Sequence, residues 1–276
     1  MYHNSIGVIY ELGKLLNQGA EPLVDLGVDC VQLVCWNQKL LTKENAKKVL
    51  ELMNGRIRIG SFWAGWSGPK VWDNVDGPHT LGIVPSAYRS KRIEELLCGA
   101  DFTHALGVKD MATHIGFIPE QPSHPDYREV VVAVKYLADY CKERAIYFNF
   151  ETGQETPTTL MRLIQDAEKD NLGINLDPAN LILYGKGNPV DAIDLFKGRI
   201  RGVHVKDGEY PCGDLYKLGK ERVVGEGAVN FPVFLSKLLS QGYQGDFYIE
   251  REISGEQQMI DIKKTLIYIK EKMNNR

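Results

Sequence analysis

The chain has 276 residues, of which 43% are hydrophobic and 25% charged, as in ordinary globular proteins with one large core. Its 33 Lys and Arg residues against 36 Asp and Glu give a formal net charge of −3 and a pI near 6.1. This balance argues against nucleic acid as a partner, because binding a polyanion favours an excess of cationic surface.

The first residues, MYHNSIGVIYELGKLL, lack the basic start, apolar run and small-residue cleavage site of a secretory signal. No stretch approaches the roughly eighteen apolar residues that a membrane-spanning helix needs. We therefore expect a cytoplasmic protein that makes no membrane contact. The five cysteines include no CxxC pair, which favours free thiols over a disulfide framework or a thiolate zinc site.

Short β-rich runs alternate with longer segments of helical pattern along the whole chain. The predicted strands are residues 6–10, 30–36, 57–66, 110–117, 146–152, 173–177, 201–207 and 246–252. Between them lie helical segments such as residues 42–55, which open with Thr42 as an N-cap and close on Gly55. Eight strand–helix units predict an α/β fold, a single (β/α)₈ TIM barrel forming one domain over residues 1–276. An open doubly wound sheet is the alternative, but no GxGxxG follows the first strand.

Two long loops, residues 65–85 and 208–227, follow the third and seventh predicted strands. In a barrel both would lie at the carboxyl ends of the strands, where active sites form, as lids or substrate walls. A plain surface excursion is the alternative. The second loop places Lys217, Lys220 and Arg222 near a glycine pair, which leaves phosphate binding open, although Glu226 between those glycines favours solvated surface charge.

Side chains alternate along a strand, so the apolar residues of the last four runs fix which neighbours point into the barrel. With Phe148 and Phe150 facing the helices, Glu151 points inward at the end of the fifth strand. The same rule turns four further polar side chains toward the barrel axis: Asp177, His204, Lys206 and Glu250. Four neighbouring strands are thus predicted to deliver polar groups to one place.

Three carboxylates brought together repel one another unless a cation lies between them. With one imidazole added, a single divalent metal is the simplest explanation, and an oxygen-rich set favours Mn²⁺, with Mg²⁺, Co²⁺ or Zn²⁺ as alternatives. Each residue alone also has a structural interpretation, such as a turn or helix-cap role for Asp177 before Pro178. Asn149 and Asn175, one layer lower, could orient the carboxylates or simply satisfy each other.

The motifs FNFETG, NLDPANL, GVHVKD, VGEGAVNF and YIERE, in this order, resemble the xylose isomerase-like TIM-barrel superfamily of sugar isomerases and epimerases. The resemblance covers nearly the whole chain and is closest in pattern to ketose 3-epimerases and inositol-pathway enzymes. It implies a homo-oligomer and four metal ligands, with the two glutamates doubling as acid and base; the ligands would be Glu151, Asp177, His204 and Glu250. Asn180 stands where ketose 3-epimerases tend to carry a histidine, and we count it among the expected substrate contacts.

The other half of the barrel is expected to form the substrate wall. Trp36, Trp63 and Trp66 end the second and third strands, and Trp72 lies in the following loop. Aromatic faces suit the C–H side of a sugar, although simple packing explains tryptophan equally well. Two residues at the end of the fourth strand, His114 and Phe117, would complete the contact surface, with a structural hydrogen bond as the alternative for His114.

This site suits proton abstraction next to a carbonyl, with the charge of the resulting enediolate stabilised by the metal. Glu151 and Glu250 would transfer the proton on a small-molecule carbohydrate, which makes the protein a sugar or sugar-phosphate isomerase or epimerase. Lys206 could support the oxyanion, or pair with Asp207 or Glu250. The alternatives are a lyase or dehydratase acting on a keto-sugar or keto-inositol, an endonuclease IV-like DNA repair enzyme, which needs more histidines, and a non-catalytic sugar-binding barrel.

Overall fold

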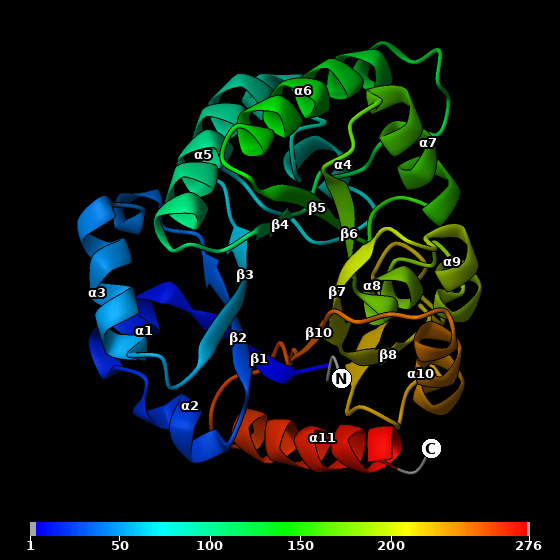
Figure 1. Cartoon of the computed structure of the whole chain (residues 1–276). Helices are drawn as coiled ribbons and strands as arrows, with labels where there is room; N and C mark the ends of the chain where they lie inside the picture. The colour runs from blue at the N-terminus through cyan, green and yellow to red at the C-terminus, as the bar shows by residue number, and fades with distance from the viewer. Residues whose placement is uncertain (1–3, 275–276) are drawn as a thin grey trace.

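The computed structural model describes residues 4–274, in which a closed ring of eight parallel strands is surrounded by helices (Figure 1). The barrel strands are β1 (Ile6–Glu11), β2 (Cys30–Cys35), β3 (Arg58–Ala64), β4 (Asp110–Thr113), β5 (Tyr147–Glu151), β6 (Leu172–Leu176), β7 (Ile200–Val205) and β10 (Asp246–Ile249). They follow one another in chain order around the ring, and β1 pairs with β10 to close it. Each of the eight predicted runs overlaps one of these strands, so the TIM-barrel prediction is confirmed.

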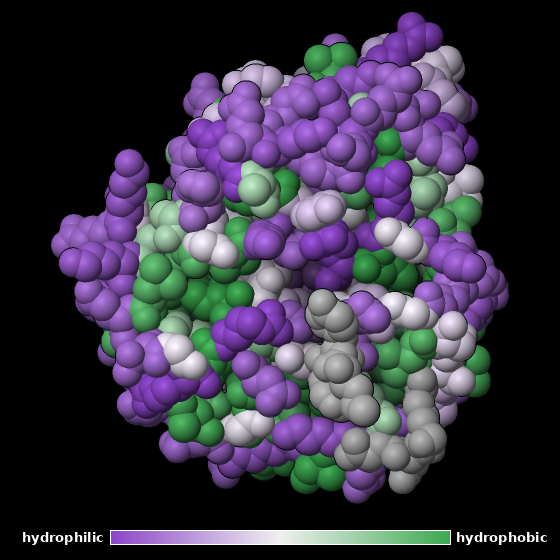
Figure 2. Space-filling view, viewed as in Figure 1, coloured by the Kyte–Doolittle hydropathy of each residue, from purple (hydrophilic) through white to green (hydrophobic). Residues whose placement is uncertain are grey.

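The helices lie outside the strands and present hydrophilic side chains to solvent, as α5 and α6 do in Figure 2. Their bounds are α1 (Leu12–Gln18), α2 (Glu21–Leu26), η1 (Gln38–Leu40), α3 (Lys43–Met53), α4 (Gly77–Thr80), α5 (Ser86–Ala105), α6 (Pro125–Lys142), α7 (Pro157–Ala167), α8 (Pro178–Leu183), α9 (Pro189–Leu195), α10 (Phe231–Ser240) and α11 (Glu256–Asn274). Within residues 4–274, none of these helices is long and apolar enough to cross a membrane.

Local sequence signals set where α3 begins and ends. The side chain of Thr42 accepts a hydrogen bond from the backbone N–H of Asn45 at 3.1 Å, so it caps the helix as predicted. At the other end Asn54 and Gly55 take left-handed backbone angles, with φ of 44° and 69°. A left-handed residue cannot continue an α-helix, and this is why the helix stops there.

The core lies between the outer side of the barrel and the inner sides of the helices. Phe148, Phe150 and Ile174, which the alternation rule turns toward the helices, are at most 1% exposed. Because the apolar side chains of each strand point outward to the helices, the polar side chains that alternate with them point into the barrel. Asn149, Asn175 and other amides are buried there. The same packing that stabilises the fold therefore concentrates polar groups along the barrel axis.

The loop of residues 65–85 is fixed to the segment after β4. Gly82 has φ of +67°, and a Cβ atom there would lie 1.8 Å from the carbonyl oxygen of Ile115. No other residue fits this close approach, which lets the N–H of Ile83 donate to the Ile115 carbonyl at 2.8 Å. The loop contains one short helix, α4, and is held against the segment that follows β4.

The loop of residues 208–227 contains a two-stranded antiparallel ribbon that the sequence analysis did not predict. It is formed by β8 (Asp207–Glu209) and β9 (Lys220–Arg222). The carboxylate of Asp207 accepts backbone N–H bonds from Gly225 and Gly227, at 3.0 and 3.1 Å. Strands of three residues are too short to show an alternating pattern, so this ribbon left no periodic signal in the sequence.

Candidate metal centre and substrate pocket

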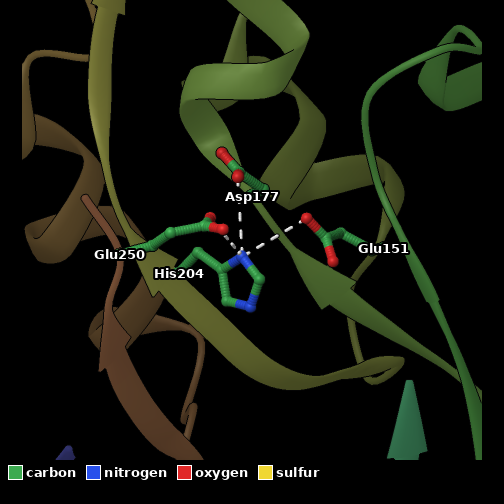
Figure 3. A group of neighbouring side chains, drawn as sticks. All are labelled: Glu151, Asp177, His204 and Glu250. Carbon is green, nitrogen blue, oxygen red and sulfur yellow. Dashed lines mark ion pairs between the residues drawn. The ribbon is translucent and has the colours of Figure 1, made fainter. Parts of the chain in front are cut away.

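Four polar side chains meet at the carboxyl ends of β5, β6, β7 and β10. Glu151 is the last residue of β5, and His204 lies in β7. Asp177 directly follows β6, and Glu250 directly follows β10. One ligand atom from each of the four lies within 4.8 Å of the others. Figure 3 shows the three carboxylates pointing toward the Nδ1 atom of His204. This atom is 3.4 Å from Glu151 Oε1, 3.5 Å from Asp177 Oδ2 and 3.1 Å from Glu250 Oε2.

The donor atoms of this group fit a metal ion. Asp177 Oδ2, His204 Nδ1 and Glu250 Oε2 are buried and make no hydrogen bond within the described chain. A buried polar atom without a partner costs about 1–3 kcal/mol, more when it is charged. Three carboxylates and one imidazole form a set that a hard or borderline divalent ion satisfies. The four residues could therefore hold a divalent metal.

The local field around the four groups is strongly negative. Burial alone would lower the pKa of His204, but the carboxylates of Glu151 and Glu250 outweigh it and raise that pKa well above its ordinary value. Burial alone would raise the pKa of Glu151, yet the imidazoles of His114 and His204 bring it well below the usual range. Glu151 is therefore held in its ionised form, and the field that favours an imidazolium would equally favour a divalent cation.

Asp177 has a second function that fixes its orientation. Its Oδ1 atom accepts a hydrogen bond from the N–H of Asn180 at 2.9 Å and caps α8. The helix-cap interpretation and the ligand interpretation are thus compatible, because one carboxylate oxygen serves each. Capping with Oδ1 leaves Oδ2 directed at the group of four.

A layer of amides lies beneath His204. Its Nε2 atom is 2.8 Å from Gln32 Oε1 and 2.8 Å from Asn175 Nδ2. If Nε2 donates its proton to Gln32, the lone pair of Nδ1 is directed at the carboxylates, which is the tautomer that a cation requires. Gln32 was not among the residues predicted from the sequence, although the alternation rule applied to the second strand turns it inward. Asn149 instead donates to Asp110 at 3.0 Å, away from the four groups.

Lys206 is 1% exposed and lies among carboxylates. Its Nζ atom is 3.0 Å from Glu252, 3.3 Å from Glu250 and 3.5 Å from Asp177. Burial alone would lower its pKa, but these carboxylates raise it well above the ordinary value. This geometry matches the alternative in which Lys206 pairs with Glu250, and its charge offsets part of the negative field.

Several donors hold Glu151 in place. The indole N–H of Trp63 donates to its Oε2 atom, and the side-chain amide of Asn180 donates to Oε1 at 3.2 Å. The Nε2 atom of His114 lies 3.3 Å from the same Oε1. Trp63, Asn180 and His114, all expected as substrate contacts, therefore also orient a carboxylate of the centre.

A pocket of about 480 Å³ opens above the group of four. Four of the six expected substrate contacts line it: Trp36, Trp63, His114 and Asn180, as does Trp72 in the long loop. Trp66 and Phe117 do not belong to the lining. Trp66 is fully buried beneath the guanidinium of Arg92, and Phe117 packs edge-on against Tyr184. These two residues support the wall from behind.

The structure adds polar residues that the sequence analysis did not select. Gln154 and Tyr184 line the pocket, and neither the amide of the first nor the hydroxyl of the second has a hydrogen-bond partner. Glu155, 4% exposed, lies near His114, and burial raises its pKa to about 7. No periodicity marks any of the three, because they follow strand β5 or end helix α8 in irregular backbone.

The basic residues of the second long loop lie away from the pocket. Lys217 pairs with Asp214 at 3.2 Å, and Arg222 pairs with Glu209 at 2.8 Å, all on the surface. None of the three basic residues, Lys217, Lys220 and Arg222, belongs to the pocket lining. Their arrangement matches the solvated-charge alternative for this loop rather than a phosphate cradle.

Comparison with known proteins agrees with this architecture. A model of the xylose isomerase-like TIM barrel family matches residues 20–271. A xylose isomerase domain protein from Planctomyces limnophilus has a TM-score of 0.90 and 31% identity, covering 98% of this chain and 96% of its own.

Two further crystal structures share the fold at lower identity. A D-tagatose 3-epimerase-like protein has a TM-score of 0.73 and 22% identity, covering 98% of this chain and 97% of its own. A D-allulose 3-epimerase from Methylomonas sp. has a TM-score of 0.73 and 15% identity over 99% of both chains. No curated protein matches this chain significantly.

Proposed function

The chain belongs to the xylose isomerase-like TIM barrel family, and from that premise we propose that it is a metal-dependent isomerase or epimerase of a carbohydrate. The supporting observation is one site in which three carboxylates and one imidazole converge at the floor of a pocket with aromatic walls. The match to the family model and the shared fold with structures named as epimerases, such as the D-tagatose 3-epimerase-like protein, support this proposal.

We propose that Glu151, Asp177, His204 and Glu250 hold the metal and that Mn²⁺ is the ion. Oxygen donors with one imidazole suit Mn²⁺ and Mg²⁺ better than a soft ion, while Co²⁺ and Zn²⁺ remain testable alternatives. A bound divalent ion would stabilise negative charge that develops on substrate oxygens during proton removal. Gln32, as acceptor for the Nε2 proton, keeps the imidazole oriented for this role.

The proton transfer is assigned to the two glutamates. Glu151 is ionised and lines the pocket, and we assign it to accept a proton from the carbon next to the substrate carbonyl. Glu250 comes from β10, on another side of the pocket, and could return a proton to the substrate. Return to the opposite face of the same carbon gives an epimerase, and return to the neighbouring carbon gives an isomerase.

The side chains around the pocket position the substrate and exclude water. Trp36, Trp63 and Trp72 offer aromatic faces on one side, where the C–H face of a sugar would pack. Lys206 is assigned to charge compensation among the carboxylates, because three of them already surround its Nζ atom. Direct support of the oxyanion by Lys206 would require it to leave those partners.

The test is proton exchange in D₂O. Protein loaded with Mn²⁺ is incubated with free ketoses, ketose phosphates, keto-glycosides and keto-inositols, and NMR identifies the carbon that gains deuterium. Deuterium at an inverted carbon supports an epimerase, deuterium at the neighbouring carbon supports an isomerase, and loss of water or an aglycone supports the lyase alternative. Absence of exchange across the whole panel would contradict the proposal.

Three expectations from the sequence stay predictions with separate tests. One domain over residues 1–276 predicts a single protected fragment in limited proteolysis. A homo-oligomer predicts a solution mass that is a multiple of the 31.1 kDa chain in light scattering. A cytoplasmic location predicts recovery in the cytosolic fraction of cells that express the protein.

A further inference from the structure

We infer that Gln154 and Tyr184 form a hydroxyl-recognition subsite that binds an uncharged end of the carbohydrate, beside the metal centre and outside its ligand set. The inference rests on the proposed function, since it takes the ligand to be a carbohydrate. It goes beyond that function by assigning two residues to specificity and by excluding a phosphate group from this end of the substrate.

The first observation is that both side chains are buried in the pocket wall without partners. Gln154 is 1% exposed, and neither its Oε1 nor its Nε2 makes a hydrogen bond within the described chain. Tyr184 is 6% exposed, and its hydroxyl is likewise unpartnered. Each such group costs about 1–3 kcal/mol of desolvation, which a bound hydroxyl group would recover. A fold rarely retains three unpaired polar atoms in one place without a ligand that uses them.

The second observation is where these residues lie in the site. Gln154 follows the metal-centre residue Glu151 by three positions, and Tyr184 ends α8, the helix that Asp177 caps. Both belong to the lining of the same pocket as His204 and Glu250. Both side chains therefore form part of the wall around a ligand whose reacting end lies at the centre of four, although neither belongs to that centre.

The two groups lie close together and offer complementary chemistry. The amide of Gln154 lies within reach of the Tyr184 phenol and opposes the rise that burial causes in its pKa, but the two groups are not aligned for a hydrogen bond. An amide presents one acceptor and two donor hydrogens, and a phenol presents one donor and one acceptor. That combination matches adjacent hydroxyl groups of a polyol, each of which donates and accepts.

Charge on the pocket wall distinguishes a hydroxyl from a phosphate. The lining contains no Lys or Arg among the residues that the structure describes, but it contains Glu151, Glu250 and Glu252. Lys206, the nearest cation, is held by three carboxylates. Even with a cation held by Glu151 and Glu250, a phosphate group would find no Lys or Arg in this wall to pair with, and phosphate recognition relies on such groups or on clustered backbone N–H groups.

The test measures sugar binding by tryptophan fluorescence, because Trp36, Trp63 and Trp72 line the same pocket. Protein loaded with Mg²⁺, which does not quench the emission, is titrated with D-fructose, D-tagatose, D-allulose and methyl 3-keto-D-glucoside. The series is repeated with single-deoxy analogues and with D-fructose 6-phosphate. The variants are Gln154→Met and Tyr184→Phe, which remove the polar atoms and nearly keep the shape.

Tyr10→Phe serves as the matched control, because Tyr10 also has a buried, unpartnered hydroxyl but does not belong to the pocket lining. We expect Gln154→Met and Tyr184→Phe to weaken the tightest neutral sugar about tenfold or more, and Tyr10→Phe to leave its Kd unchanged. The deoxy analogue that lacks the contacted hydroxyl should bind wild type and variant equally. The phosphate ester should bind at least about tenfold more weakly than the free sugar.

Three results would overturn the inference: variants that bind every sugar as wild type does, a phosphate ester that binds more tightly than its parent, or no binding of any neutral sugar. Failure of the proposed function has a different signature. If the sugar binds with the expected dependence on Gln154 and Tyr184 but gains no deuterium, the subsite stands and the catalytic proposal falls. If deuterium exchange occurs but neither variant changes its rate or the binding of the sugar, the catalytic proposal stands and the subsite falls.

Discussion

One side of the barrel mouth, formed by β5, β6, β7 and β10, ends in carboxylates and an imidazole, whereas β2 and β3 on the other side end beside indole rings. The charged side keeps its groups in place through neighbours such as Gln32, Asn175 and Lys206. The aromatic side depends on a long loop, since Trp72 lies in residues 65–85 and still lines the pocket.

Each side has a loop anchored by one buried charge whose partners are backbone groups. On the aromatic side Arg92, fully buried, donates to the carbonyl oxygens of Ser67, Pro69, Thr80 and Gly82, at 2.6–3.1 Å. On the charged side Asp207, 1% exposed, accepts from the N–H groups of Gly208, Gly225, Gly227 and Val229, at 2.9–3.1 Å. A buried charge can thus be satisfied by several loop dipoles instead of a counter-ion, and its sign decides which backbone groups turn inward.

The largest effect is expected on the charged side, from Asp177→Asn. Asparagine also caps helices well, so α8 should persist while one negative ligand is lost. We expect kcat/KM for deuterium exchange to fall by at least about a thousandfold, since stabilisation by the metal is worth several kcal/mol. NMR exchange rates would measure the loss of activity, and calorimetric titration with Mn²⁺ would measure the accompanying loss of metal affinity.

The matched control for that experiment is Glu209→Gln, at an exposed carboxylate that pairs with Arg222 on the surface. It changes the net charge equally and should leave metal affinity and exchange unaltered. Unchanged Mn²⁺ affinity in Asp177→Asn would remove Asp177 from the metal centre and weaken the contrast between the two sides.

The next largest effect is expected on the aromatic side, from Arg92→Leu. Removing the guanidinium leaves four carbonyl groups without their donor, so we expect the free energy of unfolding to fall by about 3–5 kcal/mol. Burial lowers the pKa of Arg92 to about 10, so the wild-type charge persists at neutral pH. Urea denaturation measures the loss, and proteolysis within residues 67–82 should accelerate.

Arg56→Leu provides the comparison for the arginine prediction. Arg56 is 41% exposed and pairs with Glu21 at the surface, so its removal should change stability by no more than about 0.5 kcal/mol. Equal effects of the two substitutions would mean that the loop is held by its own packing and not by Arg92.

A pH-dependent effect is expected from Glu155, which follows β5 of the charged side and lies near His114. Burial raises its pKa from 4.5 to about 7, so between these pH values the folded protein binds more protons than the unfolded chain. The contribution of Glu155 to stability therefore falls as pH rises through this window, by up to about 3 kcal/mol. Glu155→Gln should remove that slope in metal-free protein and melt at a higher temperature than wild type at pH 8.

The exposed Glu226 gives the control for the pH experiment, since Glu226→Gln should keep the wild-type slope. Thermal unfolding monitored by circular dichroism from pH 4.5 to 8 would compare the three proteins. A wild-type slope that survives in Glu155→Gln would assign the pH dependence to other groups.

The smallest effect is expected from Trp72→Ala, in the loop of the aromatic side. The ring of Trp72 lies 5.3 Å from that of His114 and 6.3 Å from that of Trp36, and the residue is 40% exposed. We expect sugar binding to weaken by about tenfold or less, with kcat almost unchanged, because only a packing face is lost. The control is Tyr216→Ala. Tyr216 lies in the loop of the charged side and is 75% exposed, so its removal should leave sugar binding and kcat unchanged.

Much of the fold and part of the site could be predicted because side-chain alternation is a local property. Phe148 and Phe150 must be buried against helices, and this alone directs Glu151 to the barrel axis. For Lys206 the sequence left two interpretations open, support of the oxyanion or pairing with a carboxylate such as Glu250. The choice depends on how closely Glu250 and Glu252 approach its Nζ atom, which alternation along a strand does not set.

The sequence by itself determined eight strands, their inward polar residues and the resemblance to sugar isomerases, since each is written in short periodic runs and motifs. Only the tertiary structure decided that Gln32 lies beside His204, 172 positions away, and that Gln154 and Tyr184 share one wall. Closing the ring joins distant strands, and irregular loops take the path that satisfies their backbone groups. Both depend on contacts between residues far apart in the chain, which no local pattern encodes.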